Sequence, residues 1–176
     1  MKIYVGIGSR KCPPNILSQM EEIGKYLATN RWILRSGGSD GSDRAFETGC
    51  DVANGIKEIY LPWQNFNGSN SALFTQHKDA FILASTIHPA WDKLSYGAKK
   101  LHARNCHQLL GHNLKTPADI VICWTSEGKE VGGSATVLKL AKLNNIRIIN
   151  LALENIDIKN INREEAFIQN EVKDIK

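Results

Sequence analysis

The sequence predicts an α/β protein with a Rossmann-like fold, a three-layer αβα sandwich around a mainly parallel sheet of about five strands. Short apolar runs alternate with stretches of helical periodicity along the chain, and this alternation is typical of right-handed βαβ units. The run at 119–124 is almost continuously apolar, as expected of a strand buried on both faces of a parallel sheet. The 176 residues suit one domain.

The five strands are predicted at the short apolar runs 3–7, 32–34, 57–61, 119–124 and 147–151. Helices are predicted between Pro14 and Asn30 and at about 42–53, 92–110 and 133–143. Asp40 or Ser42 is expected to cap the second of them. The strand order usual for this class, 3-2-1-4-5, would bring the loops that follow strands 1, 2 and 4 together at one edge of the sheet.

One domain is expected to span residues 1–152. Within it, residues 62–90 lack a regular pattern and are interpreted as an irregular insert or lid, with a short helix that continues through Phe81. The segment 153–176 is polar and is expected to form a C-terminal helical tail.

The composition is that of a globular protein, with 42% hydrophobic and 23% charged residues and a net charge of +4. Such a mild positive charge favours a phosphorylated partner but says little about DNA. No apolar stretch approaches the roughly 20 residues of a membrane span, and the N-terminus enters a strand pattern directly. We therefore expect a cytoplasmic protein without a membrane partner. The four cysteines contain no CxxC pair and are expected to be reduced thiols.

Three glycine-containing loops at the predicted strand ends could bind phosphate. The loop after strand 1 offers a hydroxyl and a guanidinium beside a flexible turn, with the candidates Gly8, Ser9 and Arg10. The loop after strand 2 could turn backbone N–H groups toward a ligand at a helix N-terminus, with the candidates Ser36, Gly37, Gly38, Asp40, Gly41 and Asp43. Its aspartates would repel phosphate, so they either cap the helix or contact a ribose or a base. A tight turn or a helix cap would explain these two loops without a ligand.

The third loop opens a helix shortly after the buried strand 119–124. Its small residues and hydroxyls form an anion cradle, with the candidates Gly132, Gly133, Ser134 and Thr136. Within the long helix at 92–110, Arg104 could clamp a phosphate with two N–H groups, unless it is a surface residue. His102 and His107 are five residues apart and no cysteine or aspartate completes a ligand set, so we expect neither a metal nor a cofactor.

At these residues the chain resembles the SLOG superfamily, a Rossmann-like group that joins the DprA/Smf recombination mediators and the LOG phosphoribohydrolases. It is similar above all to the small single-domain members that are common in bacterial and phage genomes. The segment 36–47 resembles the signature SGGAxGADxAFE of this group. The order of 101–105, a strand, and 132–136 resembles the LOG succession MHxRK, strand and PGGxGTxxE. The match spans about residues 3–151, and 62–90 stays unmatched.

The resemblance implies candidate catalytic residues. LOG enzymes cleave the N-glycosidic bond of nucleoside 5′-monophosphates, and the motif arginine, here Arg104, and the terminal glutamate are implicated in that chemistry. Aligned without gaps, this chain carries Lys139 in place of the glutamate. Lysine supplies neither negative charge nor a general base at neutral pH. Glu47, Glu127 or Glu130 could substitute, and Glu47 and Glu130 are the expected catalytic carboxylates.

Three functions follow from these observations. The first is hydrolysis of a nucleoside 5′-monophosphate at its N-glycosidic bond. The second is a non-catalytic protein that senses or sequesters a nucleotide or a signalling derivative, which the loss of the glutamate favours. The third is DprA-like binding of single-stranded DNA, against which stands the absence of any run of basic residues interleaved with aromatics. The expected partner is a nucleotide or phosphorylated small molecule, and the resemblance implies a homodimer.

Overall fold

A five-stranded, all-parallel sheet forms the centre of the molecule. The computed structural model describes residues 1–74, 77–130, 132–156 and 158–161. The strands lie in the order β3-β2-β1-β4-β5, which confirms the predicted order. Their bounds are β1 Ile3–Gly8, β2 Ile33–Ser36, β3 Lys57–Ile59, β4 Ile120–Trp124 and β5 Arg147–Asn150. The order reverses between β1 and β4, where an open sheet of this kind leaves a crevice at its carboxyl edge.

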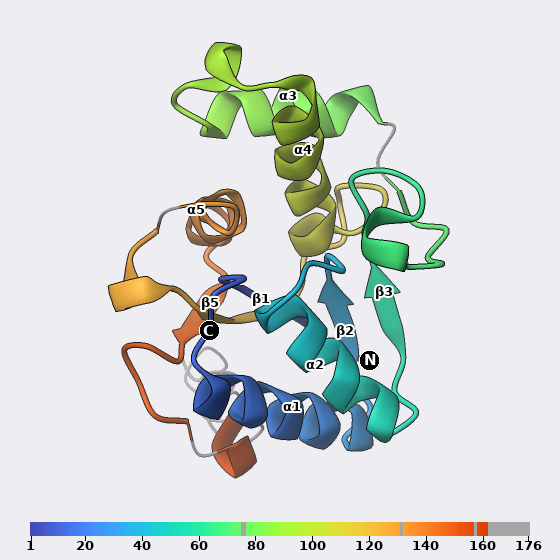
Figure 1. Cartoon of the computed structure of the whole chain (residues 1–176), viewed down its shortest axis with the longest axis vertical. Helices are drawn as coiled ribbons and strands as arrows, with labels where there is room; N and C mark the ends of the chain where they lie inside the picture. Colours follow the sequence, from blue (N-terminus) through green and yellow to red (C-terminus); the bar gives the residue numbers. More distant parts are fainter. Residues whose placement is uncertain (75–76, 131, 157, 162–176) are drawn as a thin grey trace, which may run out of the picture.

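Two helical layers cover the sheet, so the predicted Rossmann-like αβα sandwich is confirmed. Helices α1 (Pro14–Thr29) and α2 (Ser42–Val52) pack on one face, and α4 (Tyr96–Leu110) and α5 (Ala135–Leu143) pack on the other (Figure 1). Neighbouring strand residues alternate between the two cores: Tyr4 and Ile120 face α1 and α2, whereas Val5 and Val121 face α4 and α5.

Helix α4 is shorter than the helix expected at 92–110. A 3₁₀ turn at Trp91–Lys93 comes first, and α4 starts only at Tyr96. The reason is Ser95, whose Oγ accepts a hydrogen bond from the N–H of Ala98 at 3.2 Å and thereby caps the helix. Two other elements are also shorter than expected. The strand predicted at 57–61 is β3, which ends at Ile59, and the helix predicted at 133–143 is α5, which starts at Ala135.

The start of α2 differs from the predicted cap. Gly41 occupies the N-cap position with φ 78°, and no side chain caps the helix. Asp40 is exposed, while Ser42 Oγ donates a hydrogen bond to the carbonyl of Ser9 at 3.0 Å. A Cβ atom on Gly41 would lie 2.5 Å from the carbonyl oxygen of Arg10. Glycine is therefore required because the loops after β1 and β2 touch at this point.

The segment 62–90 is more regular than the sequence suggested. It holds a 3₁₀ turn at Phe66–Gly68 and the ten-residue helix α3 (Lys78–Ile87), which lies against α4 (Figure 1). Beyond β5, the described chain contains a 3₁₀ turn at Ile158–Asn160. The rest of the expected helical tail, 162–176, lies outside the described residues.

The four cysteines are all buried and unpaired, as expected of structural thiols. In the described part of the chain, no helix combines the length and the apolar character that a membrane span requires.

Candidate functional site

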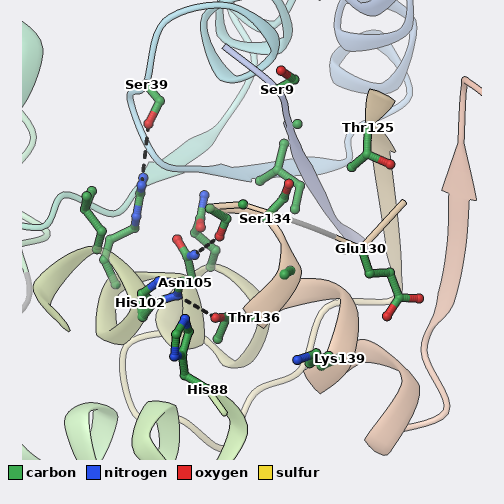
Figure 2. Close-up of a pocket in the computed structure, with 18 of the residues that line it drawn as sticks. Ser9, Ser39, His88, His102, Asn105, Thr125, Glu130, Ser134, Thr136 and Lys139 are labelled. Atoms are coloured by element: carbon green, nitrogen blue, oxygen red, sulfur yellow. Dashed lines mark hydrogen bonds between the residues drawn. The ribbon is translucent and has the colours of Figure 1, made fainter. Parts of the chain in front are cut away.

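A cavity of about 800 Å³ opens at the carboxyl ends of β1 and β4. Its walls come from the loops after these strands, the N-terminal turn of α5, the inner side of α4 and the residues that follow α3 (Figure 2). The predicted site residues on its wall are Gly8, Ser9, Arg10, Asp43, Arg104, Glu130, Gly132, Gly133, Ser134 and Thr136. Those that the structure does not bring to the wall are Ser36, Gly37, Gly38, Asp40, Gly41 and Glu47.

The loop before α5 lies open to the cavity. Gly132 has φ 74°, and an added Cβ on Gly132 or Gly133 would have no atom within 4 Å. The carbonyl of Gly133 accepts a hydrogen bond from Asn105 Nδ2 on α4, which fixes the loop against that helix. The first turn of a helix leaves backbone N–H groups without intrahelical partners. An anion beside Ser134 would therefore meet donors and the positive end of α5.

The loop after β1 is held tightly by its neighbours. Gly8 has φ 155°, and a Cβ there would lie 2.6 Å from both Ser42 Oγ and the carbonyl of Trp124. The N–H of Ser9 donates to that same carbonyl at 3.0 Å. These contacts place Ser9 on the cavity wall and leave the exposed Arg10 at its rim.

Arg104 is a buried residue and not a surface residue, with 5% of its area exposed. Its Nη1 donates to the carbonyl of Gly37, its Nη2 donates to Ser39 Oγ at 3.5 Å, and Nη1 lies 3.8 Å from Asp43 Oδ2. Its Nε is buried without a hydrogen-bond partner. Burial is the main cause that lowers the pKa of Arg104, and it also raises the pKa of Asp43 to about 6, against the attraction of Arg104.

The glycines of the loop after β2 accommodate protein atoms instead of facing the cavity. A Cβ on Gly37 would lie 1.4 Å from Arg104 Nη1. The carbonyl of Gly38 accepts a hydrogen bond from Asn67 Nδ2 at 3.1 Å, and Ser36 Oγ donates to the carbonyl of Gly6 at 2.7 Å. Of the predicted residues in this loop, only Asp43 lines the cavity. The physical reason is that glycine permits the close approach of α4 and of the β1 loop here.

The two candidate carboxylates, Glu47 and Glu130, lie in different places, and only Glu130 lines the cavity. Glu47 Oε1 accepts a hydrogen bond from Lys57 Nζ at 2.9 Å, so its side chain is turned toward β3 and away from the cavity. Glu130 lines the cavity and forms an ion pair with Lys142. Lys139 also lines the cavity, one turn of α5 after Thr136. Lys139 aligns with the glutamate of the LOG motif, so in this chain that position places a cation on the cavity wall.

Two histidines that the sequence did not assign to the site lie on the cavity wall. His102 Nδ1 is 2.7 Å from Thr136 Oγ1, and the ring of His88 lies 4.5 Å from that of His102, measured between centroids (Figure 2). Burial, followed by the charges of His88 and Arg104, lowers the pKa of His102 to about 4. The resemblance of 101–105 to MHxRK carried a signal for His102, whereas His88 lies in the unmatched segment and had none.

Apolar side chains also line the cavity. They are Ile87 at the end of α3, Pro89 after it, and Ala98 and Leu101 of α4. Gln108 and Thr125 add buried polar groups elsewhere, and Thr125 is held by Asn150, whose Nδ2 donates to Thr125 Oγ1 at 2.8 Å. The cavity thus combines an anion-binding end with apolar lining residues, which suits a ligand that carries both a phosphate and a flat ring.

Comparison with known proteins identifies the fold. No protein-family model matches the sequence, and no curated protein matches it. Among solved structures, DNA processing protein A from Helicobacter pylori is similar over 99% of this chain and 81% of its own, with 19% identity and a TM-score of 0.57. DprA from Streptococcus pneumoniae is similar over 96% of this chain, with 17% identity and a TM-score of 0.53, and this chain spans 56% of it.

A third structure, the Chlamydomonas Moco carrier protein, is similar over 86% of this chain and 77% of its own, with 19% identity and a TM-score of 0.52. Identities at this level establish the arrangement of helices and strands and not a shared activity. The chain therefore has the Rossmann-like fold that is seen in DprA and in the Moco carrier protein.

Proposed function

We propose that the protein binds a nucleotide, or a phosphorylated molecule of similar size, in the cavity at the carboxyl edge of its sheet. The observation that carries the proposal is the anion-binding end of this cavity, where Gly133, Ser134 and Thr136 at the start of α5 face the space together with Lys139. A volume of about 800 Å³ lies in the range of small-molecule sites.

The charges around the cavity support an anionic ligand. Each of its two carboxylates already has a cation close by, Asp43 at 3.8 Å from Arg104 and Glu130 in its ion pair with Lys142. Among the described residues, no ion-pair partner of Lys139 or Arg10 is found. The buried Nε of Arg104 adds a donor without a protein acceptor. A phosphate would satisfy these groups through charge-assisted hydrogen bonds.

We favour binding of the intact ligand over its cleavage, as in a sensor or sequestering protein. An oxocarbenium-like transition state requires negative charge near the sugar. At the position of the motif carboxylate, Lys139 brings positive charge to the cavity, and Glu47 points elsewhere. The Moco carrier protein, which shares the fold, is by its name a carrier.

Hydrolysis of the N-glycosidic bond is the second candidate. Glu130 favours it, since this carboxylate lies on the cavity wall and could act as a base on water, with Arg104 contributing positive charge. Its ion pair with Lys142 would have to open or turn for that role.

Binding of single-stranded DNA is the third candidate, and one observation favours it. Aromatic and basic side chains lie close together along 91–100, with Lys99 Nζ 5.6 Å from the ring centre of Trp91 and Lys100 Nζ 4.9 Å from that of Tyr96. The H. pylori structure that shares the fold is described as binding single-stranded DNA. A salt-dependent rise in the fluorescence anisotropy of a labelled oligonucleotide, reduced in Lys100→Glu, would support this candidate.

The test of the proposed function uses a mixture of ribo- and deoxynucleoside monophosphates and signalling nucleotides. The purified protein is incubated with the mixture, and mass spectrometry then identifies the molecules in the filtrate and those released when the protein is denatured. We expect one intact nucleotide to be retained by the wild type and lost in Lys139→Ala. Free base with a pentose phosphate in the filtrate would establish hydrolysis instead. If neither a retained nucleotide nor these products are found, the proposal of a nucleotide ligand is refuted. Size-exclusion chromatography with light scattering tests the proposed homodimer, and cell fractionation tests the proposed cytoplasmic location.

A further inference from the structure

The contact between His102 and Thr136 joins α4 to the anion-binding end of the cavity. His102 Nδ1 and Thr136 Oγ1 are 2.7 Å apart, a full hydrogen bond (Figure 2). Thr136 is 2% exposed and belongs to the first turn of α5, and among the described residues His102 is the hydrogen-bond partner found for its hydroxyl. The direction in which this bond is donated decides what the hydroxyl can offer to a ligand.

A hydroxyl carries one hydrogen, which gives the bond two possible directions. If Thr136 donates to His102, only oxygen lone pairs remain for the ligand, and these repel an anionic oxygen. If His102 donates from Nδ1, the hydroxyl hydrogen of Thr136 is free to point at the ligand. Only the second direction suits the anionic ligand that we propose for this cavity.

The imidazole of His102 lies in surroundings that favour its neutral form. Burial, then His88 and Arg104, lowers its pKa to about 4, so it has a single N–H at neutral pH. On the other ring, His88 Nδ1 accepts a hydrogen bond from the N–H of Ala90 at 3.2 Å, and the neutral His88 therefore has its proton on Nε2. The tautomers of the pair are thus expected to differ.

We propose that His102 is a positioning residue for the ligand: its Nδ1–H donates to Thr136 Oγ1 and turns the threonine hydroxyl into a donor for an anionic oxygen. This inference rests on the proposed function. It assigns to that site a residue, His102, that fixes the direction in which the Thr136 hydroxyl donates its hydrogen. It also couples binding to protonation. An anion close to His102 stabilises the imidazolium, which has an N–H on both nitrogens and keeps the same bond to Thr136.

Other titratable groups face the same space and must be separated from His102. His88 packs on it from the end of α3, Arg104 lies on its own helix, and Lys139 lies on α5. Across the cavity are Asp43, whose pKa is about 6, and the Arg10 and Glu130 side chains. A variant that changes only His102 keeps all of these groups, so the difference between it and the wild type isolates His102.

Two substitutions separate the donor from the titration. In His102→Asn, the side-chain Nδ2 occupies the place of the imidazole Nδ1 and can donate to Thr136, but it does not titrate. In His102→Phe, the ring stays and both the donor and the titration are lost. The probe is sulfate, which remains a dianion throughout the pH range, so that any pH dependence of binding comes from the protein.

The first measurement is the tautomer of His102, read from long-range ¹H–¹⁵N NMR spectra at pH 7.5 and assigned by the signals that His102→Asn loses. We expect Nδ1–H for His102 and Nε2–H for His88. An Nε2–H tautomer for His102 would overturn the assignment, because Thr136 would then be the donor. This readout does not depend on any ligand.

The second measurement is sulfate affinity by titration calorimetry at pH 8 and pH 5.5. Between these values the affinity of the wild type should rise about three- to tenfold more than that of His102→Asn, and at pH 8 His102→Asn should bind more tightly than His102→Phe. Equal pH dependence in the wild type and His102→Asn would overturn the coupling to His102. Absence of sulfate binding at every pH would contradict the proposed function, and the tautomer would still decide whether His102 orients Thr136.

Discussion

Gly37 and Arg104 fit together so closely that a methyl group on Gly37 would lie 1.4 Å from Arg104 Nη1. Nη1 donates to the carbonyl of Gly37, and the same guanidinium lies 3.8 Å from the carboxylate of Asp43. The glycine thus lets α4 place a buried cation beneath the loop after β2. Gly37 lies outside the cavity, but through this contact it determines where Arg104 and Asp43 lie on the cavity wall.

Replacing Gly37 with alanine should therefore destabilise the fold and displace Arg104. The new methyl group meets a buried guanidinium that cannot leave without abandoning Asp43, and overpacking of this kind costs about 1–3 kcal/mol. Urea unfolding measures the loss. Gly97→Ala is the control, since Gly97 lies in α4 with no atom within 4 Å of an added Cβ, and its stability should be equal to or above that of the wild type. Equal effects of the two substitutions would contradict the packing argument.

The carboxyl group of Asp43 should make the protein less stable as the pH rises. Its pKa is raised from 3.8 to about 6, so between these values the folded state holds a proton that the unfolded state has lost. The contribution of Asp43 to stability consequently falls between pH 4 and pH 7, by about 2–3 kcal/mol. The measurement is the free energy of unfolding in urea of the wild type and of Asp43→Asn over this pH range. The difference between the two proteins should change with pH by this amount. A difference that is constant with pH would refute the raised pKa.

His102 should give the opposite pH dependence. Its pKa is lowered from 6.5 to about 4, so between these values the unfolded state binds a proton that the folded state lacks. The contribution of His102 to stability is then present above pH 6.5 and is lost on acidification, by about 1–2 kcal/mol once the partial exposure of the ring is allowed for. The same unfolding series on His102→Asn tests this. If the variant loses stability in parallel with the wild type on acidification, His102 is not the group responsible.

Lys139→Ala should weaken binding of a nucleoside monophosphate by about tenfold or more. The substitution removes a cation that lies beside the anion-binding end of the cavity and has no ion-pair partner among the described residues. Lys25→Ala makes the same charge change on an exposed part of α1, away from the cavity, and should leave the affinity within about twofold. Titration calorimetry compares the two variants. Similar losses in both would show that only the net charge matters.

The fold could be predicted from the sequence because its evidence is local. Apolar runs such as 120–123 and the helical spacing of Met20, Ile23 and Leu27 depend on neighbouring residues. The strand order was expected from the fold class, and the structure has that order. Helix α3 runs to Ile87, beyond the short helix expected through Phe81, and its packed residues Ala80, Leu83, Ala84 and Ile87 do follow helical spacing.

The candidate site could be predicted only in part. The glycines at 132 and 133 face open space, as the sequence suggested, but those at 37 and 41 face protein atoms. A glycine that admits a ligand and a glycine that admits a guanidinium give the same sequence pattern, and only the positions of the surrounding atoms distinguish them. His88 comes from a segment without any motif, so nothing in the sequence could place it beside His102.

A crystal structure of the protein with the nucleotide that it retains from the mixture tests the proposed site most directly. We expect the phosphate to lie within hydrogen-bond distance of Ser134, Thr136 and Lys139, with the base against the apolar lining residues Ile87 and Leu101. A nucleotide bound on the outer surface of α3 and α4, with the cavity left to water, would contradict it.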